Sequence, residues 1–302
     1  MKRWPLLLIL LVCSRSILGQ GFMYRADSLH KNRVIGVSAS SVGLGVGSIL
    51  ALKYVWYDDF DKSPFHFFDD SHEWGQMDKL GHFYTSFHFS TLISDFYQWS
   101  GVKPRKAALI GGAYSIAYMT SFEFLDAYNT EWGFSWSDIS FNVAGAASST
   151  IQTYFWNERR VNLKFSFHES GLAQYRPSVL GNDFPSRTLK DYNGQTYWLS
   201  FNPFNWTKNE SFLPEWFNIS LGYSINNQLI GDGGSYVLTN GSQQTVFTPY
   251  RQYFISLDVD FEKIHTNSRA LQILFRGLNC LKVPFPAVEY SQGKLAFRPF
   301  YF

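Results

Sequence analysis

The stretch Phe217-Asn-Ile-Ser-Leu-Gly-Tyr-Ser-Ile225 alternates apolar residues with small polar ones. Successive side chains of a β-strand point to opposite faces of the sheet, so one face of this segment is apolar and the other is polar. Residues 253–261 repeat the pattern, with Ser256, Asp258 and Asp260 on one face. The period of two predicts that the second half of the chain is rich in β-strands.

Other segments after Arg160 extend this pattern. We expect further strands at Leu163 to His168, Thr196 to Asn202, Tyr236 to Thr239, Ala287 to Tyr290 and Lys294 to Phe302, and a short helix from Ser268 to Leu278. Outward apolar and inward polar residues, with aromatic ends, are typical of outer-membrane β-barrels. An antiparallel sheet with one face on a helical half fits the same pattern, so both architectures remain open.

The half before Arg160 has a helical pattern instead. It predicts four helices, at Val34 to Trp56, Phe83 to Trp99, Ala107 to Tyr128, and Ser137 to about Trp156, with Ser137 as an N-cap. The first of these is long enough to cross a bilayer, and a buried helix of the bundle is the alternative. Gly43 and Gly47 share one of its faces and predict close backbone approach. The small residues from Ala144 to Ser148 predict tight packing of the last helix.

These patterns predict an α+β fold. A bundle of about four helices, residues 20–160, precedes an antiparallel sheet or small barrel, residues 161–302. A parallel sheet with alternating helices is not expected, because helical and strand-like segments do not alternate along the chain.

The first nineteen residues are typical of a secretory signal peptide. Met1-Lys-Arg is basic, Leu6 to Val12 is an apolar run too short to span a bilayer, and Gly19 offers a small residue for cleavage. Cys13 is a candidate for lipidation, but Val12 stands where a small residue is expected, so cleavage after Gly19 is preferred. The mature chain would keep one cysteine, Cys280, which gives no disulfide framework and no cysteine metal cage.

The composition favours contact with a membrane. Charged residues make up 17% of the 302 residues, below the usual ~25%, and aromatic residues make up 19%. Trp and Tyr suit the boundary between water and lipid. The net charge of +2 predicts no strong attraction to nucleic acid. We therefore expect an exported envelope protein at the outer membrane, with membrane lipid or an envelope protein as its partner.

The apolar helical segments carry an unusual set of polar side chains near their ends: Asp78, Lys79, His82, Glu123, Asp126, Asp138 and Asn142. Polar groups in apolar helices cost free energy unless they are paired. Glu123 and Asp126 lie at a helix C-terminus, where the helix dipole disfavours negative charge. In an antiparallel bundle the start of the second helix, the end of the third and the start of the fourth meet at one end. We therefore expect a single polar site there.

Several motifs resemble a known family. Trp74-Gly-Gln-Met-Asp-Lys-Leu-Gly-His82, Ser121-Phe-Glu-Phe-Leu-Asp126 and Asn142-Val-Ala-Gly145 are similar to motifs of DUF2279, an uncharacterised bacterial envelope family that includes Bacteroidetes proteins. Segments 189–200 and 282–286 extend the resemblance over nearly the whole mature chain. More loosely, the second to fourth helices resemble VanZ-like membrane proteins. Neither resemblance implies an activity.

Three interpretations of the polar set remain open. One is a structural network in which Lys79 pairs with Glu123 or Asp126, and another is a surface that binds a partner. As an ion or phosphate site, Lys79 would bind an anionic lipid head group, and a metal would be held by His82, Glu123, Asp126 and Asp138. The leading hypothesis is a non-enzymatic scaffold that faces lipid or a partner. The alternative is a metal-dependent or lipid-phosphate hydrolase using those four residues. The sequence specifies no cofactor and no catalytic nucleophile.

Overall fold

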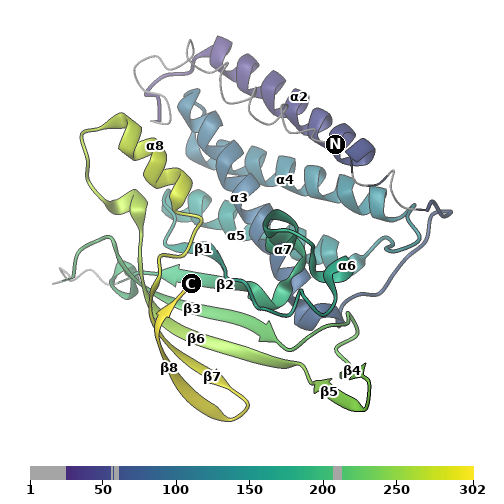
Figure 1. Ribbon diagram of the computed structural model, residues 1–302. Helices are drawn as coiled ribbons and strands as arrows, with labels where there is room; N and C mark the ends of the chain where they lie inside the picture. Colours follow the sequence, from purple (N-terminus) through teal and green to yellow (C-terminus); the bar gives the residue numbers. More distant parts are fainter. Residues whose placement is uncertain (1–24, 56, 58–60, 207–212) are drawn as a thin grey trace.

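The computed structural model describes residues 25–55, 57, 61–206 and 213–302 (Figure 1). The expected signal peptide and Cys13 lie outside these residues. Helices form the first half of the chain and an antiparallel sheet follows, so the predicted α+β class is confirmed. The change from helix to strand falls between α5 and β1, close to Arg160.

Three long helices form the centre of the bundle. They are α3 (Met77–Trp99), α4 (Pro104–Asp126) and α5 (Trp136–Trp156), and each packs against the other two. Glycines permit this close approach, because a side chain at Gly111 would collide with the backbone of Ser90, and one at Gly145 with the backbone of Phe83. The tight packing predicted for residues 144–148 is therefore present at Gly145.

The helix α2 (Lys31–Val55) lies across α3 and α4 at the outside of the bundle (Figure 1). Among the described residues it is the one helix long and apolar enough to cross a membrane, and only 11% of its most apolar stretch is buried. The helix α2 is therefore not the buried helix of the bundle that the sequence left as an alternative. Close approach occurs at Gly45, which faces Tyr114, while nothing lies near a side chain built at Gly43 or Gly47.

The helices α2 and α4 begin three residues before the predicted Val34 and Ala107, and the starts of α3 and α5 differ from the prediction in more informative ways. The helix α3 begins at Met77, six residues before the predicted Phe83, directly after the short 3-10 helix η3 (Glu73–Gln76). The cap of α5 is Ser135, whose Oγ accepts a hydrogen bond from the Asp138 amide at 3.1 Å, and not the predicted Ser137. The Ser137 hydroxyl donates to Asp70 Oδ1 instead, at 2.8 Å.

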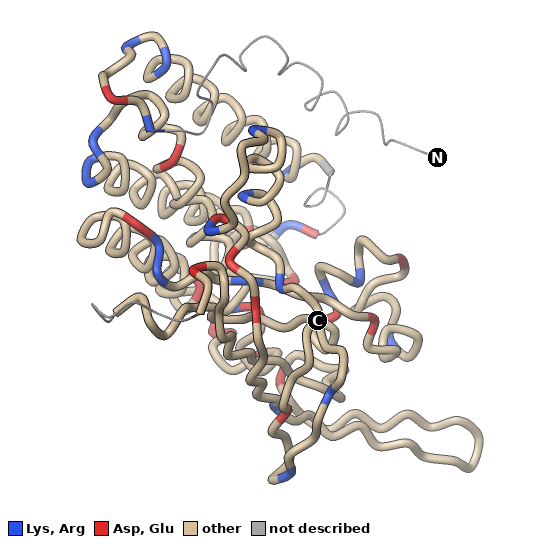
Figure 2. Tube along the Cα trace, turned by 90° about the vertical axis from the view of Figure 1, so that its left-hand side faces the viewer, with Lys and Arg blue, Asp and Glu red and all other residues tan. Residues whose placement is uncertain are grey.

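Six strands form one antiparallel sheet in the order β1-β2-β3-β6-β7-β8. Their bounds are β1 (Val161–Phe167), β2 (Gln195–Phe201), β3 (Phe217–Asn226), β6 (Tyr250–Val259), β7 (Phe285–Ser291) and β8 (Lys294–Tyr301). Among the described residues β1 and β8 do not pair with each other, so the sheet is open and does not close into a barrel. A separate hairpin consists of β4 (Tyr236–Asn240) and β5 (Gln243–Phe247) (Figure 2).

Shorter elements connect these strands. They are α6 (Pro177–Leu180), α7 (Phe184–Lys190), α8 (Arg269–Leu278) and the 3-10 helices η4 (Tyr192–Gly194), η5 (Pro203–Trp206) and η6 (Phe261–Lys263). The helix α8 matches the predicted one, and Ser268 caps it. The helices α6 and α7 lie beside the bundle above the sheet, near the end of α3 that carries the polar residues (Figure 1).

The two faces of the sheet differ in polarity. The inner face carries Ser200, Ser220 and Ser256, which are opposite one another on adjacent strands and buried. A buried ion pair, Lys164 with Asp258 at 3.0 Å, lies on the same side. The outer face carries apolar and aromatic residues. The helix α3 covers this face only over β1 and β2, where the Tyr84 ring packs against Phe165 and Tyr197.

Candidate functional site

The start of α3, the end of α4 and the start of α5 meet at one end of the bundle, as the polar pattern predicts. Lys79 is 1% exposed, and its Nζ lies 2.6 Å from Asp70 Oδ2, 2.9 Å from Asp78 Oδ2 and 2.6 Å from Asp138 Oδ1. Burial opposes the charge on Lys79, but the carboxylates of Asp78 and Asp138 raise its pKa above the ordinary value. Lys79 is therefore a charged ammonium held by three carboxylates.

This pairing differs from the predicted one. Lys79 contacts Asp70, Asp78 and Asp138 in place of Glu123 or Asp126. The reason is the position of Lys79 in the first turn of α3, which directs its side chain toward the loop at Asp70 and the start of α5. Asp70 is a site residue that the sequence did not identify. In the sequence Asp70 is visible only as part of the acidic pair Asp69-Asp70 in a loop. Residues in a loop have no helical spacing, so nothing in the sequence links Asp70 to Lys79.

His82 lies between the two groups of acids. Its Nδ1 is 3.2 Å from Asn142 Oδ1 and 3.5 Å from Glu123 Oε1. Its Nε2 is 3.9 Å from Asp78 Oδ1 and 3.8 Å from Asp138 Oδ1. Burial lowers the pKa of His82, but the surrounding carboxylates outweigh burial and raise it.

Glu123 is completely buried, and neither of its carboxylate oxygens has a hydrogen-bond partner among the described residues. Burial raises the pKa of Glu123 to about 8. Burial likewise raises the pKa of Asp138 to about 7, while the charges of His82 and Lys79 oppose this and favour its carboxylate form. Without a bound cation, the neutral form of Glu123 is therefore favoured near pH 7.

Asp126 is the one predicted site residue that stands apart. Its Oδ1 accepts a hydrogen bond from Tyr57 Oη at 2.5 Å, and Asp126 does not share in the ion pairs of Lys79 and His82. Burial raises the pKa of Asp126 to about 6. The other six predicted residues are linked through Lys79 and His82, and with Asp70 we call them the acidic cluster: Asp70, Asp78, Lys79, His82, Glu123, Asp138 and Asn142.

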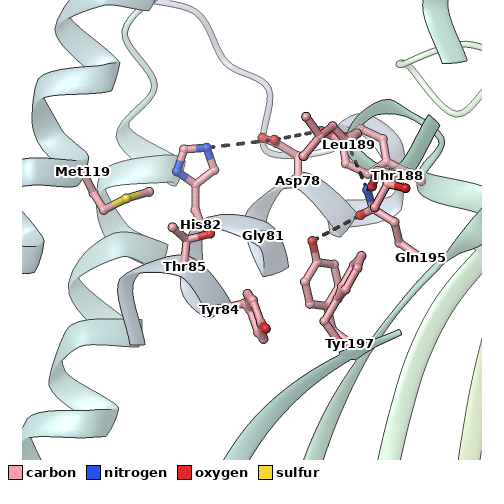
Figure 3. Close-up of a pocket in the computed structure, with 12 residues that line it drawn as sticks. Asp78, Gly81, His82, Tyr84, Thr85, Met119, Thr188, Leu189, Gln195 and Tyr197 are labelled. Atoms are coloured by element: carbon pink, nitrogen blue, oxygen red, sulfur yellow. Dashed lines mark hydrogen bonds and ion pairs between the residues drawn. The ribbon is translucent and has the colours of Figure 1, made fainter. Parts of the chain in front are cut away.

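A cavity of about 330 Å³ lies beside the acidic cluster, between α3, α7 and β2. Figure 3 shows Asp78 and His82 at one side of it and Tyr84 and Tyr197 at the other. Tyr192 donates a hydrogen bond to Asp78 Oδ1 at 3.0 Å, so the wall of the cavity is tied to the cluster. Tyr197 lines the cavity, whereas Trp198 is buried on the inner face of the sheet.

The charge of the acidic cluster suits a cation better than an anion. Four carboxyl groups surround one lysine and one histidine, and the lysine is already engaged by three of those groups. A phosphate would meet this negative charge without a free ammonium to bind it. One ligand atom each from Asp78, His82 and Asp138 lie within 4.8 Å of one another, which is a possible metal-binding group. Of the four metal ligands predicted from the sequence, only His82 and Asp138 belong to this group.

These features define an α+β protein whose helical bundle holds a buried acidic cluster beside a cavity. Residues 66–154 match the family model described as "Predicted periplasmic lipoprotein (DUF2279)". The match covers α3, α4, all but the last two residues of α5 and all seven predicted site residues, and the sheet lies outside it. It agrees with the expected export to the cell envelope. It does not support the looser VanZ-like resemblance or a source in Bacteroidetes. No curated protein and no solved structure matches the chain.

Proposed function

We propose that this chain is an exported, non-enzymatic envelope protein that lies against a lipid bilayer, the outer membrane, through the outer face of its sheet. The observation that carries the proposal is a row of exposed apolar side chains across five strands. Each residue in the row pairs with the next on the adjacent strand: Leu199, Leu221, Ile255, Val288 and Phe297, exposed by 44%, 42%, 58%, 44% and 67%.

A second row runs beside the first. It consists of tyrosines that pair across four strands: Tyr197, Tyr223, Tyr253 and Tyr290. A tyrosine has an apolar ring and a polar hydroxyl, so it is favoured where lipid meets water. Tyr253 and Tyr290 are 48% and 50% exposed, whereas Tyr197 is packed beneath Tyr84 of α3 and Tyr223 donates its hydroxyl to the Gly75 carbonyl. The exposed tyrosines on β6 and β7 therefore border the aliphatic row, as tyrosines do at a sheet surface in contact with lipid.

The inner face supports the same proposal. In a sheet surrounded by water the buried face is apolar and the solvated face is polar. Here serines and the Lys164–Asp258 pair are buried beside the apolar cluster Trp198, Phe254 and Ala287, and the aliphatic row is exposed. Water is a poor solvent for such an outer face, because large exposed apolar patches favour association with another apolar phase.

Two further features fit contact with a bilayer. The helix α2 exposes much of its apolar length. The family description names a lipoprotein, and an acylated Cys13 would provide an additional attachment to the same membrane.

Flotation with vesicles of phosphatidylethanolamine and phosphatidylglycerol tests the proposal. The mature chain should float with the vesicles, and the double variant Ile255→Asp/Val288→Asp should reduce the floated fraction at least tenfold while keeping its circular dichroism spectrum. The matched control is Val246→Asp on the separate hairpin, where Val246 is 58% exposed, and it should float like the unmodified chain. An unmodified chain that stays in the aqueous fraction, or a double variant that floats fully, would overturn the proposal.

The alternative function, a hydrolase that uses His82, Glu123, Asp126 and Asp138, has one observation in its favour. Glu123 is buried without a hydrogen-bond partner among the described residues, and it contacts His82, which lines the cavity. The charge of the cluster argues against a lipid phosphate as substrate. Hydrolysis of p-nitrophenyl acetate that is lost in Glu123→Gln would favour the hydrolase. Equal rates for both chains and for buffer would favour the scaffold.

A further inference from the structure

We infer that Asp78, His82 and Asp138 bind a divalent transition-metal ion, such as Zn²⁺ or Mn²⁺, with one coordination position open to the cavity. The inference goes beyond contact with a bilayer and does not depend on it. It rests on the tautomer of His82, the distances between the three ligand atoms, and the unpartnered carboxylate of Glu123.

The hydrogen bonds of His82 determine which of its nitrogens is free. Asn142 Oδ1 only accepts hydrogen bonds, so with the amide in this orientation the ring N–H that it contacts at 3.2 Å is on Nδ1. In the neutral ring the lone pair is then on Nε2. This nitrogen faces Asp78 Oδ1 and Asp138 Oδ1 at 3.9 and 3.8 Å, distances too long for hydrogen bonds. A ring nitrogen and two carboxylate oxygens at these separations are close enough to share one cation.

The distances are compatible with one ion. Nitrogen and oxygen ligands lie about 2.0–2.2 Å from Zn²⁺, so two of them on the same ion are at most about 4.4 Å apart. Both separations from His82 Nε2 satisfy this limit. All three atoms lie within 4.8 Å of one another, so a small movement of the carboxylates completes the site. A set of one imidazole and two carboxylates suits zinc or manganese.

The neighbouring residues supply what such a site requires. A histidine that binds a metal usually donates its other N–H to a carboxylate or carbonyl, which fixes the ring. At His82 Nδ1 the facing groups are Asn142 Oδ1 at 3.2 Å and Glu123 Oε1 at 3.5 Å. Glu123 is also an unpartnered carboxylate with 0% exposure directed into the cluster, and a nearby cation would offset the cost of burying its charge. We regard Glu123 and Asn142 as positioning residues.

Lys79 stays in place when the ion binds. It keeps Asp70 Oδ2 and Asp78 Oδ2, while the ion shares Asp78 Oδ1 with the Tyr192 hydroxyl and Asp138 Oδ1 with Lys79. On the other side Asp78 and His82 reach the cavity, where a water or a small ligand completes the coordination (Figure 3). Three protein ligands and one open position are the composition of catalytic zinc sites, in contrast to closed structural ones.

The test is a titration of the chelator-treated mature chain in detergent with Zn²⁺ alone and with Mn²⁺ alone, followed calorimetrically. We expect one ion per chain, and at least 100-fold weaker binding for His82→Gln and for Asp78→Asn. Glu123→Gln should weaken binding about 10- to 100-fold, as loss of a positioning residue does. The matched controls His72→Gln and Asp69→Asn should bind like the unmodified chain, because these residues lie outside the acidic cluster.

A measurement on the unmodified chain covers variants that do not fold. The ¹⁵N signal of His82 Nε2 should shift when Zn²⁺ is added, and that of Nδ1 should retain its attached proton. Failure to bind either ion, binding that His82→Gln and Asp78→Asn leave unchanged, or a His82 ring that keeps both protons when Zn²⁺ is present would overturn the inference. Because the titration uses detergent and no vesicles, its result is independent of the flotation experiment.

Discussion

At the scale of single residues, Lys79 decides how the acidic cluster is held together. Removing one partner of a buried ion pair leaves an uncompensated charge, which is more costly than never having buried the pair. Lys79 and Asp138 are both buried and 2.6 Å apart, whereas Asp126 is hydrogen-bonded to Tyr57. Lys79 should therefore be coupled strongly to Asp138 and weakly to Asp126.

Two double-mutant cycles check this expectation through urea unfolding. Lys79→Met alone should lower the free energy of unfolding by roughly 3–5 kcal/mol. Lys79→Met with Asp138→Asn should show a coupling of about 1–3 kcal/mol, and Lys79→Met with Asp126→Asn should be additive within ~0.5 kcal/mol. Lys103→Met, at an exposed lysine, is the control. Equal coupling in both cycles would mean that Lys79 reaches Asp126 as well.

The residues of the candidate site were largely predictable, because polar side chains at the ends of apolar helices are conspicuous. Their partners were not. Helical spacing places Asp78, Lys79 and His82 together, but it carries no information on Asp70 in the preceding loop or on Tyr192 far along the chain. For Asp126 the helical spacing led to a wrong expectation. Its spacing from Glu123 suggested a shared site, and the rotation of α4 turns it toward Tyr57 instead.

At the scale of secondary-structure elements, His88 joins the bundle to the sheet. It lies on α3, and its Nε2–H donates to the Leu163 carbonyl on β1 at 2.9 Å. Burial lowers the pKa of His88 to about 4, from an ordinary value near 6.5. Between these values the unfolded chain binds the proton and the folded chain does not. The contribution of His88 to the free energy of unfolding is therefore fully present above pH 6.5, and it is lost as the pH falls toward 4.

The expected result is that the free energy of unfolding falls between pH 6.5 and 4 by about 3 kcal/mol more in the unmodified chain than in His88→Gln. Glutamine can still donate to the Leu163 carbonyl but does not titrate. His72→Gln serves as the comparison and should keep the full pH dependence. Chemical denaturation at pH 7, 5.5 and 4 measures the difference, and parallel curves for His88→Gln and the unmodified chain would show that His88 takes no part.

Elements with a strong period were predictable, and those without one were not. The strands β3 and β6 follow from their alternation alone. The helix α3 begins earlier than expected because Asp78, Lys79 and His82 are polar and interrupt the apolar pattern over its first turns. The strand β5 was missed because Gln243-Gln-Thr has no apolar alternation, and α7 because its seven residues are too few for a period to show.

At the scale of the whole molecule, the sequence left open whether the strands form a sheet or a barrel. The alternation of side chains is the same in both, and closure depends on whether the first and last strands meet. Closure would require β1 to pair with β8, which lies more than a hundred residues later in the chain. The local pattern of side chains carries no information on such a pairing. The open sheet keeps its outer apolar face, which gives the entire molecule a surface poorly suited to water.

This surface predicts how the purified protein behaves without lipid. The row from Leu199 to Phe297 is continuous across five strands, so two copies that bring these faces together remove apolar area from water on both sides. The unmodified mature chain should therefore form dimers or larger species in detergent-free buffer and become monomeric when detergent is added. Light scattering during size-exclusion chromatography measures both states.

The variant Ile255→Asp/Val288→Asp should be monomeric in either buffer, because charge in the middle of the row makes its burial costly, whereas Val246→Asp should associate like the unmodified chain. A monomer in detergent-free buffer would mean that the outer face tolerates water, and the case for a lipid-facing sheet would lose its physical basis.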